Sequence, residues 1–190
     1  MNPKSTCRTL LRQQRQQLSV AVWQTVSQTL CERVLSLAAY QAAERIGLYW
    51  PDDQEADPRF LLTHTPDKQF FLPTLKADRT LSFRAYTQNT PLIPNRFGIP
   101  EPDDTQPTVA IAALDIVFVP FVGVDQAGYR LGRGGGYYDR TFAFKTEQRT
   151  PLLPPQLWGL AFPFQVVPNG TFPIDPWDIP LDRVITVEAH

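Results

Sequence analysis

The chain has 190 residues, of which 43% are hydrophobic and 19% are charged, a balance typical of a globular protein and not of a disordered one. This length suits a single domain over residues 1–190 with a core of its own. The net charge of −1 excludes a global positive field that would hold DNA or RNA, so any phosphate site must be local.

Cysteines and histidines are too few to build a covalent or metal framework. Cys7 and Cys31, with His64 and His190, have no spacing typical of disulfide sets or zinc sites, and we interpret both histidines as surface residues. No apolar run approaches the roughly 20 residues that span a bilayer, and the start lacks the apolar segment of a secretory signal. We therefore expect a cytoplasmic protein that does not bind a membrane.

Two helices are predicted at the amino terminus. Residues 4–18 lack Gly and Pro and are rich in Leu, Arg and Gln, and a second helix is predicted to begin after Ser19 as its N-cap. Every fourth residue is then apolar, which predicts one buried stripe, formed by Leu18, Val22, Val26, Leu30 and Val34. The basic, acid-poor start is also typical of an organellar transit peptide, a reading that we disfavour for a reason given below.

Short aromatic and β-branched runs follow from Ile46 onward and predict strands. They are "IGLYW", "QFFLP", "LSFRAY", "LDIVFVPFVGV", "LWGLAF" and "RVITV". Helices are plausible at 57–64 and 137–146, and the proline-rich segment 90–107 predicts a long ordered loop, a lid or a partly mobile connector. The alternation predicts an α/β domain with a central, mostly parallel or mixed sheet flanked by helices.

The stretch "GYRLGRGGGYYDR" at 128–140 is the strongest candidate site. It starts at the end of a turn beginning at Asp125, and the glycine run opens the helix predicted at 137–146, an arrangement that presents backbone N–H groups to an anion. Its glycines permit close backbone approach, while Arg130 and Arg133 can fork around phosphate oxygens. Asp139 is suited to hold Mg²⁺ beside a phosphate. The alternative is a tight glycine turn with solvated arginines.

These residues alone predict a site for a phosphorylated small molecule with magnesium. The stretch is neither a Walker-type P-loop nor a standard dinucleotide fingerprint. Two further hypotheses remain open at this point. One is a sugar-phosphate enzyme on a related scaffold, and the other is RNA binding by an Arg-Gly segment with stacking aromatics.

The segment "VPFVGVDQAGYRLGRGGGYYDRTF" resembles the signature of the 5-formyltetrahydrofolate cyclo-ligase family, and other segments agree in order. These are "K-x-x-x-R" near the start, "YWPDDQEAD", "RFGIPEP", "GLAFPFQVV" and "FPIDPWDIPLDRVIT". The resemblance implies an ATP-dependent, Mg²⁺-dependent enzyme that converts 5-formyltetrahydrofolate to 5,10-methenyltetrahydrofolate, and we expect a monomer with no nucleic-acid partner. Phosphorylation of the formyl oxygen would activate its carbon for attack by N10.

The same resemblance implies roles for individual residues. ATP contacts are implied at Lys4, Arg8, Arg130, Leu131, Gly132, Arg133, Gly134, Gly135, Gly136, Tyr137 and Tyr138. Folate contacts are implied at Trp50, Glu55, Arg133, Gly134, Gly135, Gly136 and Tyr137, metal contacts at Asp139 and Asp178, and catalytic roles at Arg133 and Tyr138. Because Lys4 and Arg8 are one helical step of four apart, both cations should face the phosphates, which is why we disfavour a transit peptide. The chain departs from the usual family residues at Phe121, Val124 and Phe162.

Overall fold

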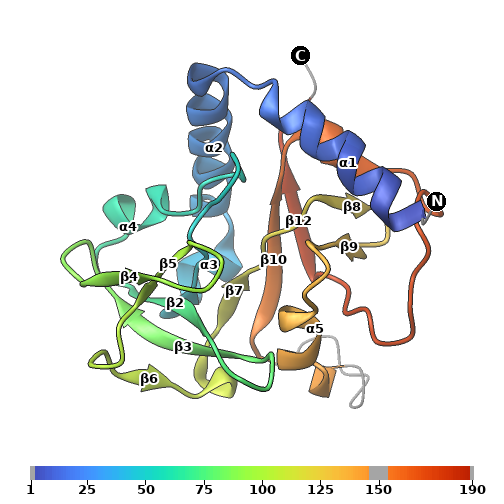
Figure 1. Ribbon diagram of the computed structural model, residues 1–190. Coiled ribbons are helices and arrows are strands. Elements are labelled where there is room, and N and C mark those ends of the chain that lie inside the picture. The colour runs from blue at the N-terminus through green and yellow to red at the C-terminus, as the bar shows by residue number, and fades with distance from the viewer. Residues whose placement is uncertain (1–2, 146–153, 189–190) are drawn as a thin grey trace.

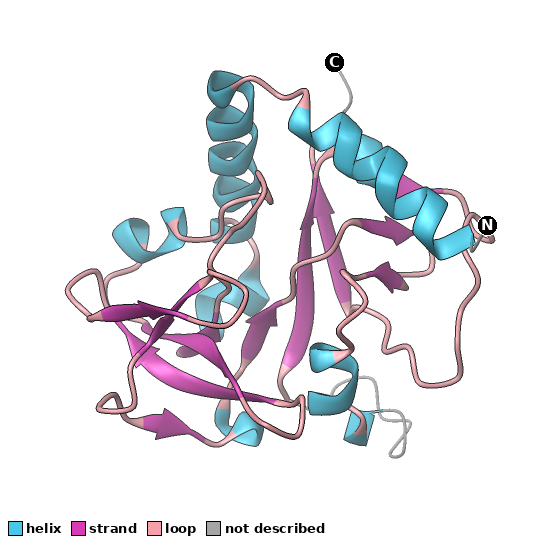
Figure 2. Cartoon of the chain, viewed as in Figure 1, coloured by secondary structure: helices cyan, strands magenta, loops and turns pink. Residues whose placement is uncertain are grey.

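The computed structural model describes residues 3–145 and 154–188 (Figures 1 and 2). The two predicted amino-terminal helices are present as α1 (Pro3–Gln16) and α2 (Val20–Leu35), and the Ser19 hydroxyl caps α2 by accepting the Val22 N–H at 3.2 Å. The shorter helices are α3 (Ala38–Ala42), α4 (Phe60–His64) and α5 (Tyr137–Thr141), with 3-10 turns η1 (Ile111–Ala113) and η2 (Pro163–Gln165).

A seven-stranded mixed sheet forms the centre of the molecule, in the order β12-β10-β7-β1-β2-β3-β6. Its strands are β1 (Arg45–Gly47), β2 (Gln69–Leu75), β3 (Leu81–Tyr86), β6 (Thr108–Val109), β7 (Ile116–Phe118), β10 (Gln156–Ala161) and β12 (Arg183–Thr186). The neighbours from β12 to β2 pair in parallel, whereas β3 is antiparallel to both β2 and β6. The predicted α/β fold with a mostly parallel or mixed sheet is confirmed.

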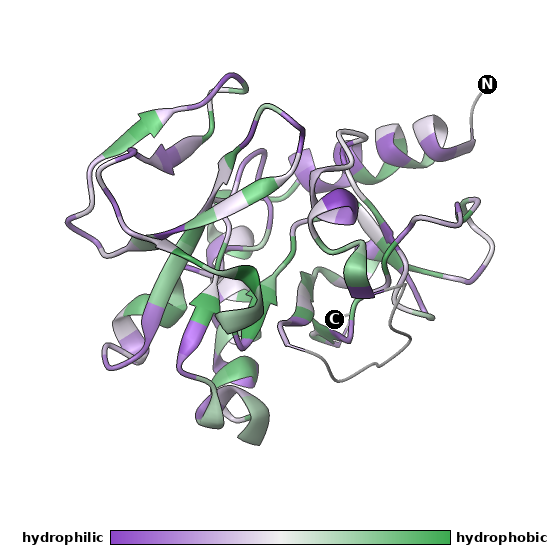
Figure 3. Ribbon diagram, turned by 90° about the horizontal axis from the view of Figure 1, so that it is seen from below, coloured by the Kyte–Doolittle hydropathy of each residue, from purple (hydrophilic) through white to green (hydrophobic). Residues whose placement is uncertain are grey.

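Both faces of this sheet are covered. In β7, Ile116 and Phe118 belong to the same buried cluster as Leu30 of α2, whereas Val117 between them belongs to a second cluster with Phe142, next to α5. This alternation across the sheet explains why the strand is apolar at successive positions. Figure 3 shows hydrophobic colour along the strands, while the helix next to the amino terminus has much hydrophilic colour.

Two smaller sheets complete the fold. The strands β8 (Gly123–Asp125), β9 (Arg130–Leu131) and β11 (Val166–Val167) form a sheet in the order β11-β8-β9. Helix α1 lies across this sheet, and Cys7 and Leu11 pack in one cluster with Leu131 (Figure 1). The strands β4 (Leu92–Pro94) and β5 (Pro100–Pro102) pair as an antiparallel hairpin.

The structure differs from the predicted elements at several points. The "IGLYW" strand ends at Gly47, and "LDIVFVPFVGV" is divided between β7 and β8 in different sheets, with Pro120 between them supplying no backbone N–H. Segment 90–107 contains the β4–β5 hairpin instead of only a loop. Helix α5 ends at Thr141, residues 144 and 145 are again helical, and residue 146 lies outside the described residues.

The predicted stripe of α2 is wrong at Val22, which is 47% exposed. The buried residues of this helix are Ser27, Leu30, Cys31 and Val34. A strict four-residue repeat drifts by about 40° per step around a helix of 3.6 residues per turn, so its ends cannot share one face. His64 is exposed as expected, and His190 lies outside the described residues. Among the helices described, none is long and apolar enough to cross a membrane.

Candidate active site

The glycine-rich loop 132–136 opens α5, as predicted, and it follows the short strand β9, which was not predicted. Arg133, Gly134 and Gly135 are exposed, whereas Leu131 is 1% exposed and its side chain lies in the core beneath α1. Only the main chain of Leu131 is therefore left to meet a ligand. Because α5 has only five residues, its dipole is small, and the attraction for an anion must come mainly from the loop amides and the nearby cations.

Within the described part of the chain, the N–H groups of residues 133–136 donate no hydrogen bond. Gly134 has a φ of +98° and Gly136 a φ of +67°, left-handed conformations that a glycine adopts without steric cost. Successive exposed amides with left-handed residues among them form a concavity that suits phosphate oxygens.

Arg130 ties the loop to the carboxy-terminal segment. It is 8% exposed, and its guanidinium donates to the Ile179 carbonyl at 2.6 Å and to Asp139 Oδ1 at 2.7 Å. The Ile179 N–H also donates to Asp139 Oδ1, at 3.3 Å. Two roles predicted for this region, phosphate binding by Arg130 and metal binding by Asp139, thus meet at one arginine–carboxylate pair. This pair contacts Ile179, the neighbour of Asp178 in the chain.

Helix α1 brings its predicted cations to the same region. Lys4 Nζ lies 2.6 Å from Asp175 Oδ2 and 2.9 Å from Asp178 Oδ2, and Arg8 Nε donates to the Gly132 carbonyl at 2.7 Å. Burial by itself lowers the pKa of Lys4, but its hydrogen bonds to the two carboxylates outweigh burial and raise it. Lys4 is therefore a cation held beside Asp175 and Asp178.

An acidic turn at 52–55 follows β1 and carries the predicted folate residue. Glu55 is 5% exposed, its Oε2 accepts the Asp52 N–H at 3.1 Å, and its carbonyl accepts the Trp23 indole N–H at 2.8 Å. Burial raises the pKa of Glu55, and the nearby guanidinium groups of Arg133 and Arg15 only partly oppose that rise. The turn lies beyond the carboxyl end of a parallel strand, where ligands bind in open α/β sheets.

Arg133 joins the glycine loop to this turn. Its Nη1 lies 2.5 Å from Asp52 Oδ2, and its Nη2 lies 3.2 Å from Glu55 Oε1. The two segments are 78 residues apart in the chain. The structure thus brings the predicted phosphate loop and the predicted folate residue into direct contact.

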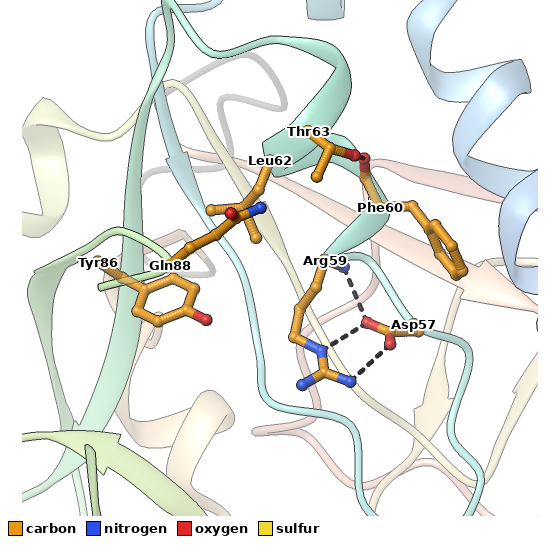
Figure 4. A pocket seen from close by; sticks show the side chains of 7 residues that line it. All are labelled: Asp57, Arg59, Phe60, Leu62, Thr63, Tyr86 and Gln88. Carbon is orange, nitrogen blue, oxygen red and sulfur yellow. Dashed lines mark hydrogen bonds and ion pairs between the residues drawn. The ribbon is translucent and has the colours of Figure 1, made fainter. Parts of the chain in front are cut away.

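Trp50 contacts Arg59 and Tyr86, two of the residues that line an open pocket of about 260 Å³, and Figure 4 shows the lining residues. The pocket is lined by Asp57, Arg59, Phe60, Leu62, Thr63, Tyr86 and Gln88. Trp50 meets Tyr86 edge to face at 6.4 Å, and the Arg59 guanidinium lies 4.1 Å from the centre of the indole ring. Arg59 is paired with Asp57 through two hydrogen bonds of 2.9 and 2.7 Å. One side of the Trp50 ring is therefore covered by the Arg59 guanidinium, whose charge is balanced by Asp57.

Tyr137 and Tyr138 follow the glycine loop directly, as the first two residues of α5. Tyr137 is 9% exposed, and its hydroxyl has no hydrogen-bond partner among the described residues. Phe97, from the turn between β4 and β5, meets the Tyr137 ring edge to face at 6.2 Å. Burial raises the pKa of Tyr138 well above its usual value, so this hydroxyl remains protonated and able to donate.

The two predicted metal ligands fit a magnesium ion in part by their chemistry. Asp139 and Asp178 supply hard oxygen donors, and their side chains are 25% and 16% exposed. One oxygen of each is engaged, Oδ1 of Asp139 by Arg130 and Oδ2 of Asp178 by Lys4. No group of three or more potential metal-ligating side chains occurs among the residues described. Mg²⁺ usually takes one or two protein carboxylates and completes its shell with phosphate and water.

The comparisons with known proteins agree with this geometry. Residues 1–187 match the model of the 5-formyltetrahydrofolate cyclo-ligase family. The chain belongs to this family. A relative named 5-formyltetrahydrofolate cyclo-ligase from Haemophilus influenzae is 35% identical over 94% of this chain and 94% of its own length. Another of the same name from Escherichia coli K12 is 31% identical over 93% and 96%.

Solved structures of cyclo-ligases share the fold. A 5,10-methenyltetrahydrofolate synthetase from Aquifex aeolicus has a TM-score of 0.80 at 30% identity, covering 96% of this chain and 89% of that one. One from Mycoplasma pneumoniae has a TM-score of 0.74 at 25% identity, covering 96% and 97%. The family and enzyme class expected from the glycine segment are confirmed. Cyclo-ligases of this family carry out the ATP-dependent conversion of 5-formyltetrahydrofolate to 5,10-methenyltetrahydrofolate.

Some residues around Glu55 were not predicted. Arg15 and Arg12 of α1 both bind Asp53 Oδ2, at 2.7 and 3.1 Å. Asp52, also not predicted, binds Arg133, which was predicted. Arg12 and Arg15 continue the series of basic residues that begins with Lys4 and Arg8, and this pattern could have indicated them. The departures Phe121, Val124 and Phe162 are all buried core residues.

Proposed function

We propose that this chain binds ATP at the glycine loop and 5-formyltetrahydrofolate at the acidic turn, and that the two substrates react where Arg133 joins them. An N-formyl group is an amide, so its carbon is a poor electrophile and its oxygen a poor leaving group. Transfer of the γ-phosphoryl group to the formyl oxygen activates the carbon. N10 then attacks, the ring closes, N10 loses its proton, and that oxygen leaves as part of phosphate, which gives 5,10-methenyltetrahydrofolate and ADP.

The proposed ATP site uses positioning and charge more than covalent chemistry, as is general for phosphoryl transfer. Its contacts are assigned to Lys4, Arg8 and residues 130–138, with the side chain of Leu131 excluded by burial. The unpaired amides of the loop receive phosphate oxygens. Asp139 and Asp178 would hold Mg²⁺, which neutralises phosphate charge when bound.

The proposed folate site uses Glu55 for the pterin. Its carboxylate can accept the amino and ring N–H donors of the pterin, while Trp50 forms an apolar wall and residues 133–137 face the formyl group. Arg133 and Tyr138 act as the catalytic donors. The single observation that carries the proposal is the contact of Arg133 with Glu55, at 3.2 Å, because it joins the two sites at the point where the formyl oxygen must meet the γ-phosphate.

We further propose that residues 1–190 form one domain that works as a monomer in the cytoplasm, with no nucleic-acid or membrane partner. The proposed ATP contacts on α1 and on the glycine loop lie in one domain, because helix α1 packs on the same small sheet that carries the loop. Cys7 and Cys31 are both buried and unlinked, which suits a reducing compartment.

The direct test is an assay of the purified chain with 5-formyltetrahydrofolate, ATP and Mg²⁺, following the absorbance of the methenyl product. We expect turnover that requires all three. Thermal shift separates the alternatives, because a ligand that binds only the folded state raises its Tm. Stabilisation by Mg-ATP and folate supports the proposal. A folded protein that shows no turnover, and that sugar phosphates or RNA alone stabilise, would overturn it.

A further inference from the structure

Arg15 is a completely buried cation that the proposed reaction has not yet used. It lies on α1 and is 1% exposed, with Nη2 at 2.7 Å from Asp53 Oδ2 and Nη1 at 3.9 Å from Glu55 Oε1. Its Nε and Nη1 have no hydrogen-bond partner in the described part of the chain. Leaving two buried donors unsatisfied is costly, so core stability alone does not explain an arginine here.

We propose that Arg15 is a positioning residue of the folate site, which keeps Glu55 an oriented carboxylate able to accept the N–H donors of the pterin. The inference rests on the proposed function, because it assigns the pterin to Glu55. Arg15 acts through Glu55, and its contact with Asp53 fixes the turn that presents this carboxylate.

The electrostatic surroundings of Glu55 require a fixed cation. The charged and titratable groups that face it are Arg15, Arg133, Asp52, Tyr49 and Tyr138. Burial favours the neutral acid, which has one donor hydrogen and a reduced capacity to accept from the pterin. Only the two arginines supply positive charge among these five groups.

The two arginines differ in how firmly they are held. The side chain of Arg133 is 36% exposed, extends from the glycine loop and is shared with Asp52, and the proposed reaction also asks it to meet phosphate. The side chain of Arg15 is 1% exposed and extends from the last turn of helix α1, and its ion pairs among the described residues are with the acidic turn alone. Arg15 therefore remains as the counter-charge of Glu55 when Arg133 turns toward ATP.

Arg12 provides a matched control on the same helix. It binds the same atom, Asp53 Oδ2, at 3.1 Å, but its side chain is 48% exposed. Among the described residues, its ion pair with Asp53 is the only one it forms, and none links it to Glu55. Loss of Arg12 removes an ion pair to the turn without removing the charge that faces Glu55.

The test measures KM for each substrate and the pH profile of kcat/KM in Arg15→Met, Arg15→Lys and Arg12→Met. We expect Arg15→Met to raise KM for 5-formyltetrahydrofolate by about tenfold and to change KM for ATP by less than about twofold. Glu55 must be ionised to bind, and removal of a cation raises its pKa further, so the acid limb should move to higher pH. Arg15→Lys should restore the wild-type acid limb, and Arg12→Met should match the wild type throughout.

A double-mutant cycle separates this role from a purely structural one. In a Glu55→Gln background no carboxylate remains to be held, so adding Arg15→Met should change neither KM nor the pH profile. Additive effects, or an Arg15→Met variant with wild-type KM and acid limb, would overturn the inference. Should Arg15→Met fail to fold, Arg15→Gln, which also removes the charge, takes its place in the cycle with the same expected results.

Failure of the proposed function gives a different result. If the folded wild type shows no turnover, calorimetric titration of 5-formyltetrahydrofolate into wild type and Arg15→Met still tests the inference. Weaker folate binding in Arg15→Met, with Arg12→Met unchanged, supports it. Equal binding in all three proteins, or no binding to the wild type, overturns it.

Discussion

The glycine loop at 132–136 and the acidic turn at 52–55 both need left-handed backbone, and they obtain it from different residues. In the loop, Gly134 and Gly136 have φ values of +98° and +67°, which glycine adopts without steric cost. In the turn, Asp53 and Gln54 have φ values of 53° and 56°, which cost a residue with a side chain about 1 kcal/mol each.

The turn compensates for this strain with side-chain contacts to α1. The carboxylate of Asp53 accepts hydrogen bonds from Arg12, Arg15 and Gln16. A loop that is proposed to expose its amides to phosphate cannot cover them with side chains, which agrees with its use of glycine. A turn that must present a carboxylate can be anchored from a neighbouring helix, so it tolerates strain. The four predictions below test this difference.

The largest effect is expected for Asp139→Asn. The amide oxygen can still accept from Arg130 and Ile179, so the loop stays folded, but the negative charge proposed for the metal is lost. We expect kcat to fall by about 100-fold or more with Tm within a few degrees of the wild type. Normal turnover with normal magnesium dependence in this variant would show that Asp139 does not bind the metal.

Gly134→Ala should damage the loop selectively. A Cβ at a φ of +98° costs about 1 to 2 kcal/mol, and the strained loop should raise KM for ATP by about tenfold. Gly170→Ala is the matched control, since Gly170 also has a positive φ, of +82°, and open space around it but lies outside the proposed site. Urea unfolding should show a similar loss of stability in both variants, and an unchanged KM for ATP in Gly134→Ala would contradict the assignment of the loop.

Asp53→Asn should weaken the anchoring of the turn in a pH-dependent way. Burial alone raises the pKa of Asp53, but hydrogen bonds from Gln16, Arg15 and Arg12 outweigh it and lower the pKa. Asparagine tolerates left-handed backbone, so the variant loses charge without added strain. We expect a loss of about 1 to 2 kcal/mol in the free energy of unfolding at pH 7.

The sign of the pH dependence follows from the lowered pKa. The charge of Asp53 stabilises the folded state above the pKa of the unfolded chain, and this contribution is lost as pH falls through the lower folded pKa. The difference between wild type and Asp53→Asn should therefore shrink below about pH 4. Urea unfolding at pH 7 and pH 3 measures it, and an equal difference at both values would exclude the ionic anchoring.

The smallest effect is expected at Gln54. Gln54→Gly removes the strain of a φ of 56°, and Gln54→Ala keeps it, while both lose the 3.3 Å hydrogen bond to the Leu18 carbonyl. Gln54→Gly should therefore be the more stable of the two by about 1 kcal/mol or less. A more stable alanine variant, measured by calorimetric Tm, would show that the turn carries no such strain.

Much of the fold and one half of the site could be predicted because their signals are local. Ser19 as the cap of α2 and the apolar run of β7 each depend on neighbours in the sequence. Spacing at four residues placed Lys4 and Arg8 on one face of α1, and both lie toward the glycine-loop region. Where prediction failed, as at Val22, a repeat that looked regular in sequence drifted around the helix.

The other half of the site depends on contacts between distant segments. Arg15 and Asp53 are 38 residues apart, Arg133 and Glu55 are 78 apart, and Lys4 and Asp178 are 174 apart. No spacing rule relates such pairs, because packing of α1 and closure of the sheet decide which charges meet. The sequence by itself determined the family, the two amino-terminal helices and the glycine loop, since these follow from short-range stereochemistry. Only the tertiary structure decided which arginine faces Glu55, since burial and ion pairing exist only when the chain is folded.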